Sequence, residues 1–186
     1  MQFIVTDEGV TRLNTANKLT MFRIALIPIF LAVLYVGFPG SNYVAMAVFI
    51  LAGLTDIADG YIARSKSQVT DFGKFTDPLA DKILVLSAML WFVEVGLMPA
   101  WAVIIVLIRE FMVTAIRLVA ASKGRVIAAG VLGKIKTLVT MICLTVLFIN
   151  LCEWMIYVCI GAITLTTVVS GIEYFMRNRD ILGMDR

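Results

Sequence analysis

The chain has 186 residues, of which 61% are hydrophobic and 16% are charged. A soluble domain carries roughly 25% charged residues, because its surface must be hydrated. The composition therefore excludes a disordered segment and argues against a water-soluble globular domain. The net charge of +3 is too weak to indicate a nucleic-acid partner, and the absence of histidine excludes mechanisms that need an imidazole.

Six apolar runs follow one another along the chain, and several reach the roughly 20 residues of a bilayer-spanning helix only with their charged ends included. The runs cover residues 24–38, 43–54, 83–101, 102–121, 138–151 and 155–172. Turn-like breaks lie at 37–42, 95–100 and 150–154. The sequence predicts an all-α integral membrane protein with six transmembrane helices, in a single domain over residues 1–186.

The basic residues are distributed unevenly between the two sides of this predicted bundle. None of the 16 Lys and Arg residues falls in the three breaks. Apart from Arg109 and Arg117, which lie within the fourth run, they are expected on the opposite side. Cytoplasmic ends carry the Lys/Arg excess, which predicts that both termini face the cytoplasm, in the cell (inner) membrane. Residues 3–18, within a juxtamembrane segment 1–18, are expected to form a short amphipathic helix on that surface; an unstructured tail is the alternative.

Four aspartates interrupt the apolar pattern in the middle of the chain. Asp56 and Asp59 are spaced i, i+3 and Asp77 and Asp81 are spaced i, i+4, so each pair lies on one face of its helix. A polar link lets the two helices run antiparallel, which brings both pairs together near the cytoplasmic end. Such carboxylates repel one another unless a cation neutralises them. Ligation by oxygen alone suits magnesium or manganese, and four acids could hold two such ions around a phosphoryl group.

Two glycines accompany these aspartates. Gly60 directly follows Asp59, and Gly73 precedes Asp77 by about one helical turn. Each allows a ligand or a neighbouring helix to approach the backbone closely. Ion pairing with nearby basic residues such as Lys82 is the competing explanation of the aspartates, but ion pairs do not require this glycine spacing.

A second cluster of charges is basic. Arg109 and Arg117 fall in the fourth apolar run, and Lys134 and Lys136 open the fifth. A positive pocket beside metal-binding carboxylates is what anionic phosphate substrates need. The alternative is that these residues only mark the cytoplasmic side and contact lipid headgroups.

The spacing of the aspartates and glycines resembles the signature of the CDP-alcohol phosphatidyltransferases at every defined position. The matching residues are Asp56, Asp59, Gly60, Ala63, Arg64, Gly73, Asp77 and Asp81. The resemblance implies a homodimer of six-helix subunits, with a cytoplasmic-side site that binds two divalent ions, Mg²⁺ or Mn²⁺. It assigns all four aspartates as metal ligands, and Asp81 also as the base that deprotonates the acceptor hydroxyl.

The same resemblance implies the substrates. Stretches at 17–23, 109–117, 124–137 and 170–175 are similar to bacterial members of the family that make phosphatidylglycerophosphate. Such enzymes join CDP-diacylglycerol, whose acyl chains stay among the membrane lipids, to sn-glycerol 3-phosphate and release CMP. The residues implied for the CDP-lipid are Asn17, Thr20, Gly60, Ala63, Arg64, Thr70 and Gly73. Those implied for the acceptor phosphate are Arg109, Arg117, Lys134 and Lys136.

Two alternatives stay open on the sequence. The first keeps the reaction but changes the acceptor to an inositol phosphate, serine or phosphatidylglycerol; the basic pocket favours a phosphorylated acceptor over serine. The second is a transporter that uses intramembrane acids. Transport sites lie near the bilayer midplane between repeated halves, whereas these acids lie toward helix ends and occur once.

Overall fold

The computed structural model describes the backbone of residues 15–66, 71–125, 127, 130–149 and 152–182, and their side chains except those of 15–20, 56–66, 71–81 and 182. This part of the chain contains six long helices and no strand. The helices are α1 (Thr15–Val36), α2 (Ser41–Lys66), α3 (Asp71–Glu94), α4 (Ala100–Ser122), α5 (Val131–Ile149) and α6 (Glu153–Arg177). A short 3₁₀-helix, η1 (Arg179–Leu182), follows. The described part therefore contains helices in the predicted number, and their ends fall at or beside the predicted breaks.

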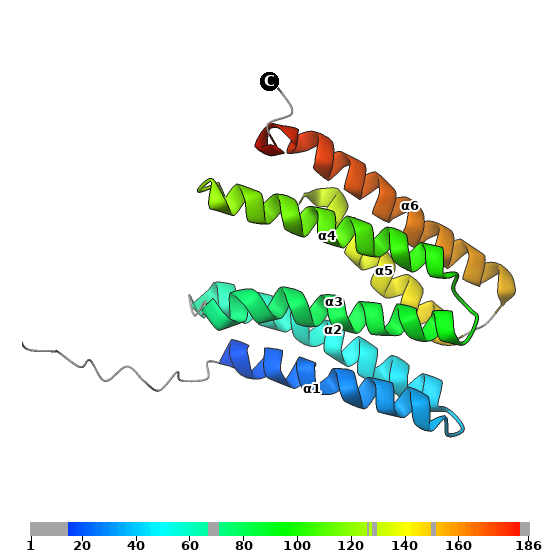
Figure 1. Ribbon diagram of the computed structural model, residues 1–186. Helices are drawn as coiled ribbons and strands as arrows, with labels where there is room; N and C mark the ends of the chain where they lie inside the picture. Colours follow the sequence, from blue (N-terminus) through cyan, green and yellow to red (C-terminus); the bar gives the residue numbers. More distant parts are fainter. Residues whose placement is uncertain (1–14, 67–70, 126, 128–129, 150–151, 183–186) are drawn as a thin grey trace, which may run out of the picture.

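Glycines with positive φ form the tight connections between helices. Gly37 and Gly40 have φ of 65° and 87° in the α1–α2 connection, and Gly96 has φ of 75° in the α3–α4 connection. Side chains other than glycine rarely adopt these backbone angles. Because the connections are short, α1 and α2 run antiparallel, as do α3 and α4 (Figure 1).

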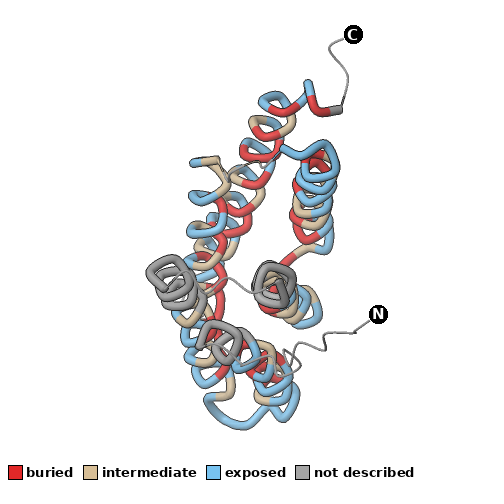
Figure 2. The backbone as a smooth tube through the Cα atoms, turned by 90° about the vertical axis from the view of Figure 1, so that its left-hand side faces the viewer, coloured by how far each residue is buried: buried red, intermediate tan, exposed pale blue. Residues whose placement is uncertain are grey.

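The helices pack in two groups that meet mainly where α2 contacts α5 and also where α3 contacts α4. In the first group α1 packs against α2 and α3, and in the second α6 packs against α4 and α5 (Figure 1). Buried residues line the inward faces of the helices, and exposed residues cover the outside (Figure 2). Four phenylalanine rings, from α1, α2, α3 and α5, pack together in the core near the end of the bundle that holds no Lys or Arg: Phe30, Phe49, Phe92 and Phe148, with ring centroids 4.7–6.1 Å apart in the contacting pairs.

The outer surface of the bundle is strongly apolar. Phe111 and Leu118 on α4 and Tyr157 on α6 are each at least 70% exposed. A soluble monomer rarely exposes contiguous apolar surface of this kind. Among the described residues, α5 and α6 are long and apolar enough to cross a membrane, while α1 and α2 contain shorter apolar stretches. These features indicate an all-helical membrane protein.

Charge separates the two ends of the bundle. The helix ends at Val36, Glu94 and Ile149 lie at one end, next to the breaks that hold no Lys or Arg (Figure 1). The opposite end carries the basic residues that flank α4 and α6. There Arg125 pairs with Asp180 of η1 at 3.0 Å. The predicted separation of charge along the bundle axis is therefore present in three dimensions.

The structure differs from the prediction in two details. A separate amphipathic helix was expected over residues 3–18, but residues 15–18 belong to α1, which runs without interruption from Thr15 to Val36. Residues 1–14 lie outside the described part. Arg23, expected among the basic residues of the charged end, is fully buried within the bundle. An arginine that close to a helix end is ordinarily expected to extend to the interface.

Candidate active site

The four aspartates lie on two helices that are continuous through them. Asp56 and Asp59 are in α2, and Asp77 and Asp81 are in α3. Because the backbone is helical there, residues spaced i, i+3 and i, i+4 start from the same face of each helix, as predicted. The helices α2 and α3 pack together, and residues 67–70 connect them. Both pairs therefore belong to the half of the bundle that ends in basic residues. Their side chains lie outside the described part, and the described side chains contain no group of three or more potential metal ligands.

The residues implied for the CDP-lipid lie on α1, α2 and α3, with the exception of Thr70. Asn17 and Thr20 are in the first turns of α1, which packs against α2 and α3. The remaining helical members are Gly60, Ala63 and Arg64 in α2 and Gly73 in α3. Thr70 lies outside the described residues. The backbone thus brings these positions to the same end of the first helix group as the aspartates.

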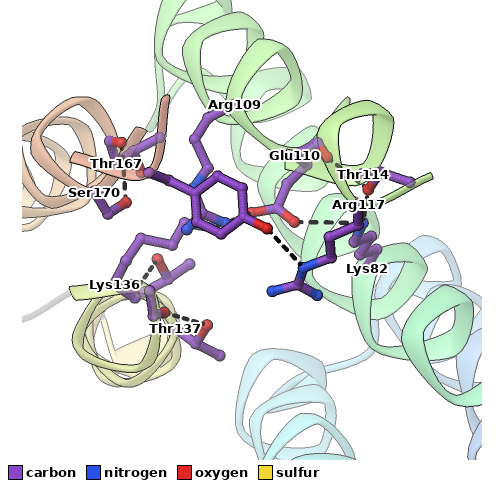
Figure 3. Close-up of polar contacts among 12 residues, drawn as sticks. Lys82, Arg109, Glu110, Thr114, Arg117, Lys136, Thr137, Thr167 and Ser170 are labelled. Atoms are coloured by element: carbon purple, nitrogen blue, oxygen red, sulfur yellow. Dashed lines mark hydrogen bonds and ion pairs between the residues drawn. The ribbon is translucent and has the colours of Figure 1, made fainter. Parts of the chain in front are cut away.

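The described part of the site centres on Glu110 of α4, which sequence reasoning did not select. Its Oε1 accepts hydrogen bonds from Arg109 Nη1 at 2.9 Å and from Lys136 Nζ of α5 at 3.0 Å. Its Oε2 lies 3.6 Å from Lys82 Nζ of α3. Figure 3 shows these side chains around the carboxylate. One carboxylate therefore joins cations from three helices.

Burial makes this cluster, Lys82, Arg109, Glu110 and Lys136, electrostatically unusual. The side chains of Lys136 and Arg109 are 6% and 11% exposed, and that of Glu110 is 17% exposed. Among the side chains that the structure describes here, three cations and one carboxylate leave a surplus charge of +2. Charges in a low-dielectric interior are costly unless they are balanced. A phosphate monoester dianion would balance this surplus.

Two glycines make room for Arg109 between the helices of the second group. A Cβ on Gly171 of α6 would lie 3.2 Å from Arg109 Cγ, and a Cβ on Gly133 of α5 would lie 3.3 Å from its Nη2. Real Cβ contacts are seldom this close. The guanidinium therefore depends on the missing side chains of both glycines for its position, and these glycines were a signal in the sequence that could have pointed to it.

Arg117 lies two turns further along α4, toward the basic end of the bundle. Its Nε donates a hydrogen bond to the hydroxyl of Tyr174 at 3.3 Å, and its guanidinium carbon lies 5.8 Å from the centre of that ring. Tyr174 is buried against Val113 and Ile116. The structure thus holds Arg117 by a hydrogen bond and a cation–π contact. Figure 3 draws Arg117 on the same side of α4 as Glu110.

The four residues expected to bind the acceptor phosphate differ in their surroundings. Arg109 and Lys136 meet at Glu110, and Arg117 is fixed by Tyr174. Lys134 is exposed, two residues from Lys136 and on a different side of α5. The structure therefore brings two of these residues together directly, places Arg117 nearby on α4, and leaves Lys134 outside the cluster.

Comparison with known proteins decides the family. The sequence profile described as CDP-alcohol phosphatidyltransferase matches residues 13–170 of the chain. The chain belongs to the CDP-alcohol phosphatidyltransferase family. The match spans the aspartates of α2 and α3 as well as the Glu110 cluster. Both halves of the candidate site thus fall inside the region that defines the family.

Individual relatives within the family extend over most of the chain. A Bacillus subtilis (strain 168) protein named CDP-diacylglycerol--glycerol-3-phosphate 3-phosphatidyltransferase is 41% identical over 187 residues, covering 91% of this chain and 97% of that protein. A Mycobacterium tuberculosis protein named "Probable phosphatidylglycerophosphate synthase" is 37% identical, covering 92% of this chain and 85% of its own length. A Wigglesworthia glossinidia brevipalpis protein with the same name as the Bacillus protein is 34% identical, with coverages of 89% and 91%.

Proposed function

We propose that this chain transfers the phosphatidyl group of CDP-diacylglycerol to sn-glycerol 3-phosphate, forming phosphatidylglycerophosphate and releasing CMP. The names and coverage of the relatives support the reaction and the acceptor. The observation that carries the proposal on this chain is the surplus charge of +2 around Glu110. It suits a phosphorylated acceptor and would be a liability for serine, which has no phosphate.

The donor atoms of the four aspartates fit two divalent cations. Asp56, Asp59, Asp77 and Asp81 offer only carboxylate oxygens, the ligands that Mg²⁺ and Mn²⁺ prefer, at helical spacings that group them in pairs. When bound, the two ions neutralise the pyrophosphate and stabilise the charge on the departing CMP. Among the described side chains, the partners of Lys82 Nζ are Glu110 and Thr114 of α4.

The chemical step is a displacement at the phosphorus next to the lipid. Asp81 takes the proton from the acceptor hydroxyl, and the resulting oxygen forms a bond to that phosphorus. The bond between the phosphorus and the CMP oxygen breaks, and CMP leaves with the electron pair. Arg109, Arg117 and Lys136 hold the acceptor phosphate, so that its hydroxyl is directed toward the phosphorus. Lys134 stands at the entrance to this pocket.

The CDP-lipid occupies the first helix group in this proposal. The small residues Gly60, Ala63 and Gly73 let the cytidine diphosphate approach the backbone of α2 and α3. Arg64 supplies positive charge to the pyrophosphate. Asn17 and Thr20 of α1, with Thr70, complete the polar surface around it. The acyl chains remain in the bilayer.

The membrane arrangement follows from the distribution of charge. We propose that all six helices cross the cell membrane, with both termini and the site on the cytoplasmic side. The reason is that the breaks at one end of the bundle hold no Lys or Arg, while the basic residues outside α4 flank the other end. The two soluble molecules, glycerol phosphate and CMP, then exchange with the cytoplasm. We further propose that two subunits associate as a homodimer through their apolar outer faces, which a mass measurement of the detergent-solubilised protein tests.

CMP release by the purified protein in detergent tests the proposed function. CDP-diacylglycerol is supplied with Mg²⁺ or Mn²⁺ and with glycerol 3-phosphate, inositol phosphate, serine or phosphatidylglycerol in parallel. We expect metal-dependent release with glycerol 3-phosphate alone. Release with another acceptor would preserve the reaction class and overturn the acceptor. No release with any acceptor, from protein shown to be folded, would contradict the proposal.

A further inference from the structure

Lys82 of α3 has surroundings that neither the family signature nor the proposed mechanism uses. Its Nζ lies 2.6 Å from Thr114 Oγ1 and 3.6 Å from Glu110 Oε2, both on α4. A lysine directly after Asp81 could have balanced the aspartates of its own helix. Its ammonium group is directed across the helix interface into the Glu110 cluster.

The hydrogen bonds of Thr114 hold Lys82 in this position. A hydroxyl has one proton to donate and two lone pairs to accept with. Thr114 Oγ1 donates its proton to the main-chain oxygen of Glu110 at 2.7 Å. Its lone pairs are then left to accept from the lysine, which is why the pair forms at 2.6 Å. An ammonium has three protons, so this bond leaves Lys82 with donors for a further partner.

Exposure distinguishes Lys82 from the other two cations of the cluster. Its side chain is 35% exposed, whereas those of Arg109 and Lys136 are 11% and 6% exposed. Arg109 and Lys136 both make hydrogen bonds to Glu110 Oε1, and Lys82 makes only the longer ion pair to Oε2. Lys82 is therefore the cation that is least satisfied by Glu110 and most accessible to an anion that enters the cluster.

From this geometry we infer that Lys82, positioned by Thr114 and Glu110, is a contact for the phosphate of the acceptor. The inference rests on the proposed function and adds one residue to its acceptor pocket. Lys82 follows Asp81 along α3 by a single residue, a rise of about 1.5 Å. A phosphate held at Lys82 is thus anchored at nearly the same level along α3 as the proposed base.

Steady-state kinetics of Lys82→Met and Thr114→Val test this inference. A hydrogen bond between charged groups contributes enough that losing it raises a Michaelis constant by about tenfold. We expect Lys82→Met to raise the KM for glycerol 3-phosphate by about that factor and to leave the KM for CDP-diacylglycerol unchanged. Lys82→Arg should restore part of the loss. Thr114→Val should raise the same KM, and Thr114→Ser, which keeps the hydroxyl, should not.

A charge-matched control variant and the activity of the wild type distinguish failure of this inference from failure of the proposed function. Arg125→Gln removes one positive charge from the same end of the bundle, in an exposed pair with Asp180, and should leave both Michaelis constants unchanged. If the wild type is active, two results for Lys82→Met overturn this inference and leave the proposed function standing. These are an unaltered KM for glycerol 3-phosphate, or an equal increase in the Michaelis constants for both substrates. Wild-type protein that is folded and inactive with glycerol 3-phosphate overturns the proposed function and this inference with it.

Discussion

Replacing Glu110 by alanine is the most direct way to test how the basic cluster is held inside the bundle. The carboxylate is the acceptor for Arg109 and Lys136 and the nearest anion to Lys82. Its removal leaves three cations from three helices facing one another with no counter-charge among the described residues. We expect the variant to be markedly less stable than the wild type.

The size of the effect follows from burial. Removing one partner of a buried ion pair costs about 3–5 kcal/mol, because the remaining charge stays desolvated. Glu110 is 17% exposed and Lys136 is 6% exposed, so the lower end of this range, about 3 kcal/mol, applies. For a chain of this length each kcal/mol lowers the melting temperature by about 2–4 °C, which gives a decrease of about 6–12 °C.

Thermal unfolding in detergent, followed with a thiol-reactive dye, measures this decrease. Cys143 and Cys159 are buried and react only when the helices separate, whereas Cys152 is exposed and gives a constant background. The double variant Glu110→Ala, Lys136→Met should regain part of the lost stability, since it removes one uncompensated cation. A pair at the same 3.0 Å distance but on the surface provides the control: Asp180→Ala should change stability by less than about 1 kcal/mol. If Glu110→Ala has the same melting temperature as the wild type, the carboxylate does not balance the buried cations, and the reasoning from burial is refuted.

Three further predictions concern the aspartates and the helix contacts. Asp81→Asn should reduce turnover by about 10²–10⁴-fold at an unchanged melting temperature, and normal CMP release would remove Asp81 as the base. Asp56→Ala should shift the magnesium titration of the initial rate to higher concentrations; a titration that superimposes on the wild type contradicts its assignment as a ligand. Gly171→Ala should destabilise by about 1–3 kcal/mol, because its Cβ would lie 3.2 Å from Arg109 Cγ. Gly161→Ala on the same helix, where a Cβ meets nothing within 4 Å, should be neutral or slightly stabilising in the same melting assay, and equal losses in the two variants would argue against the close contact at Gly171.

Much of the fold could be predicted because apolar runs and neutral turn-like breaks are local features. The break around Gly96 is visible in the sequence as a short group of glycine and proline residues, and the structure confirms it. The aspartate spacing was equally readable, since i, i+3 and i, i+4 positions share a face in any helix. What these patterns determine is the order of the helices and the faces on which their polar residues lie.

The partners of the charged side chains could not be predicted in the same way. Arg109 and Glu110 are neighbours in sequence, and nothing local indicates that Glu110 also binds a lysine of α5 and approaches one of α3. Nothing in the sequence of α3 indicates that Lys82 reaches Thr114 and Glu110, which the packing of α3 against α4 brings to it. The complete burial of Arg23 in α1 is likewise a result of helix packing that its local sequence does not indicate. Each of these contacts is decided by which helices meet, and a single sequence does not specify that.

The ring cluster of Phe30, Phe49, Phe92 and Phe148 acts on the bundle as a fixed anchor. It ties α1, α2, α3 and α5 together in the half of the molecule that faces away from the aspartates. Phe148 of α5 belongs to the second helix group and the other three rings to the first, so the cluster joins the two groups. It thereby fixes α5, which carries Lys136, relative to α2 and α3, which carry the aspartates, and the two parts of the candidate site share one aromatic support at the far end of the bundle.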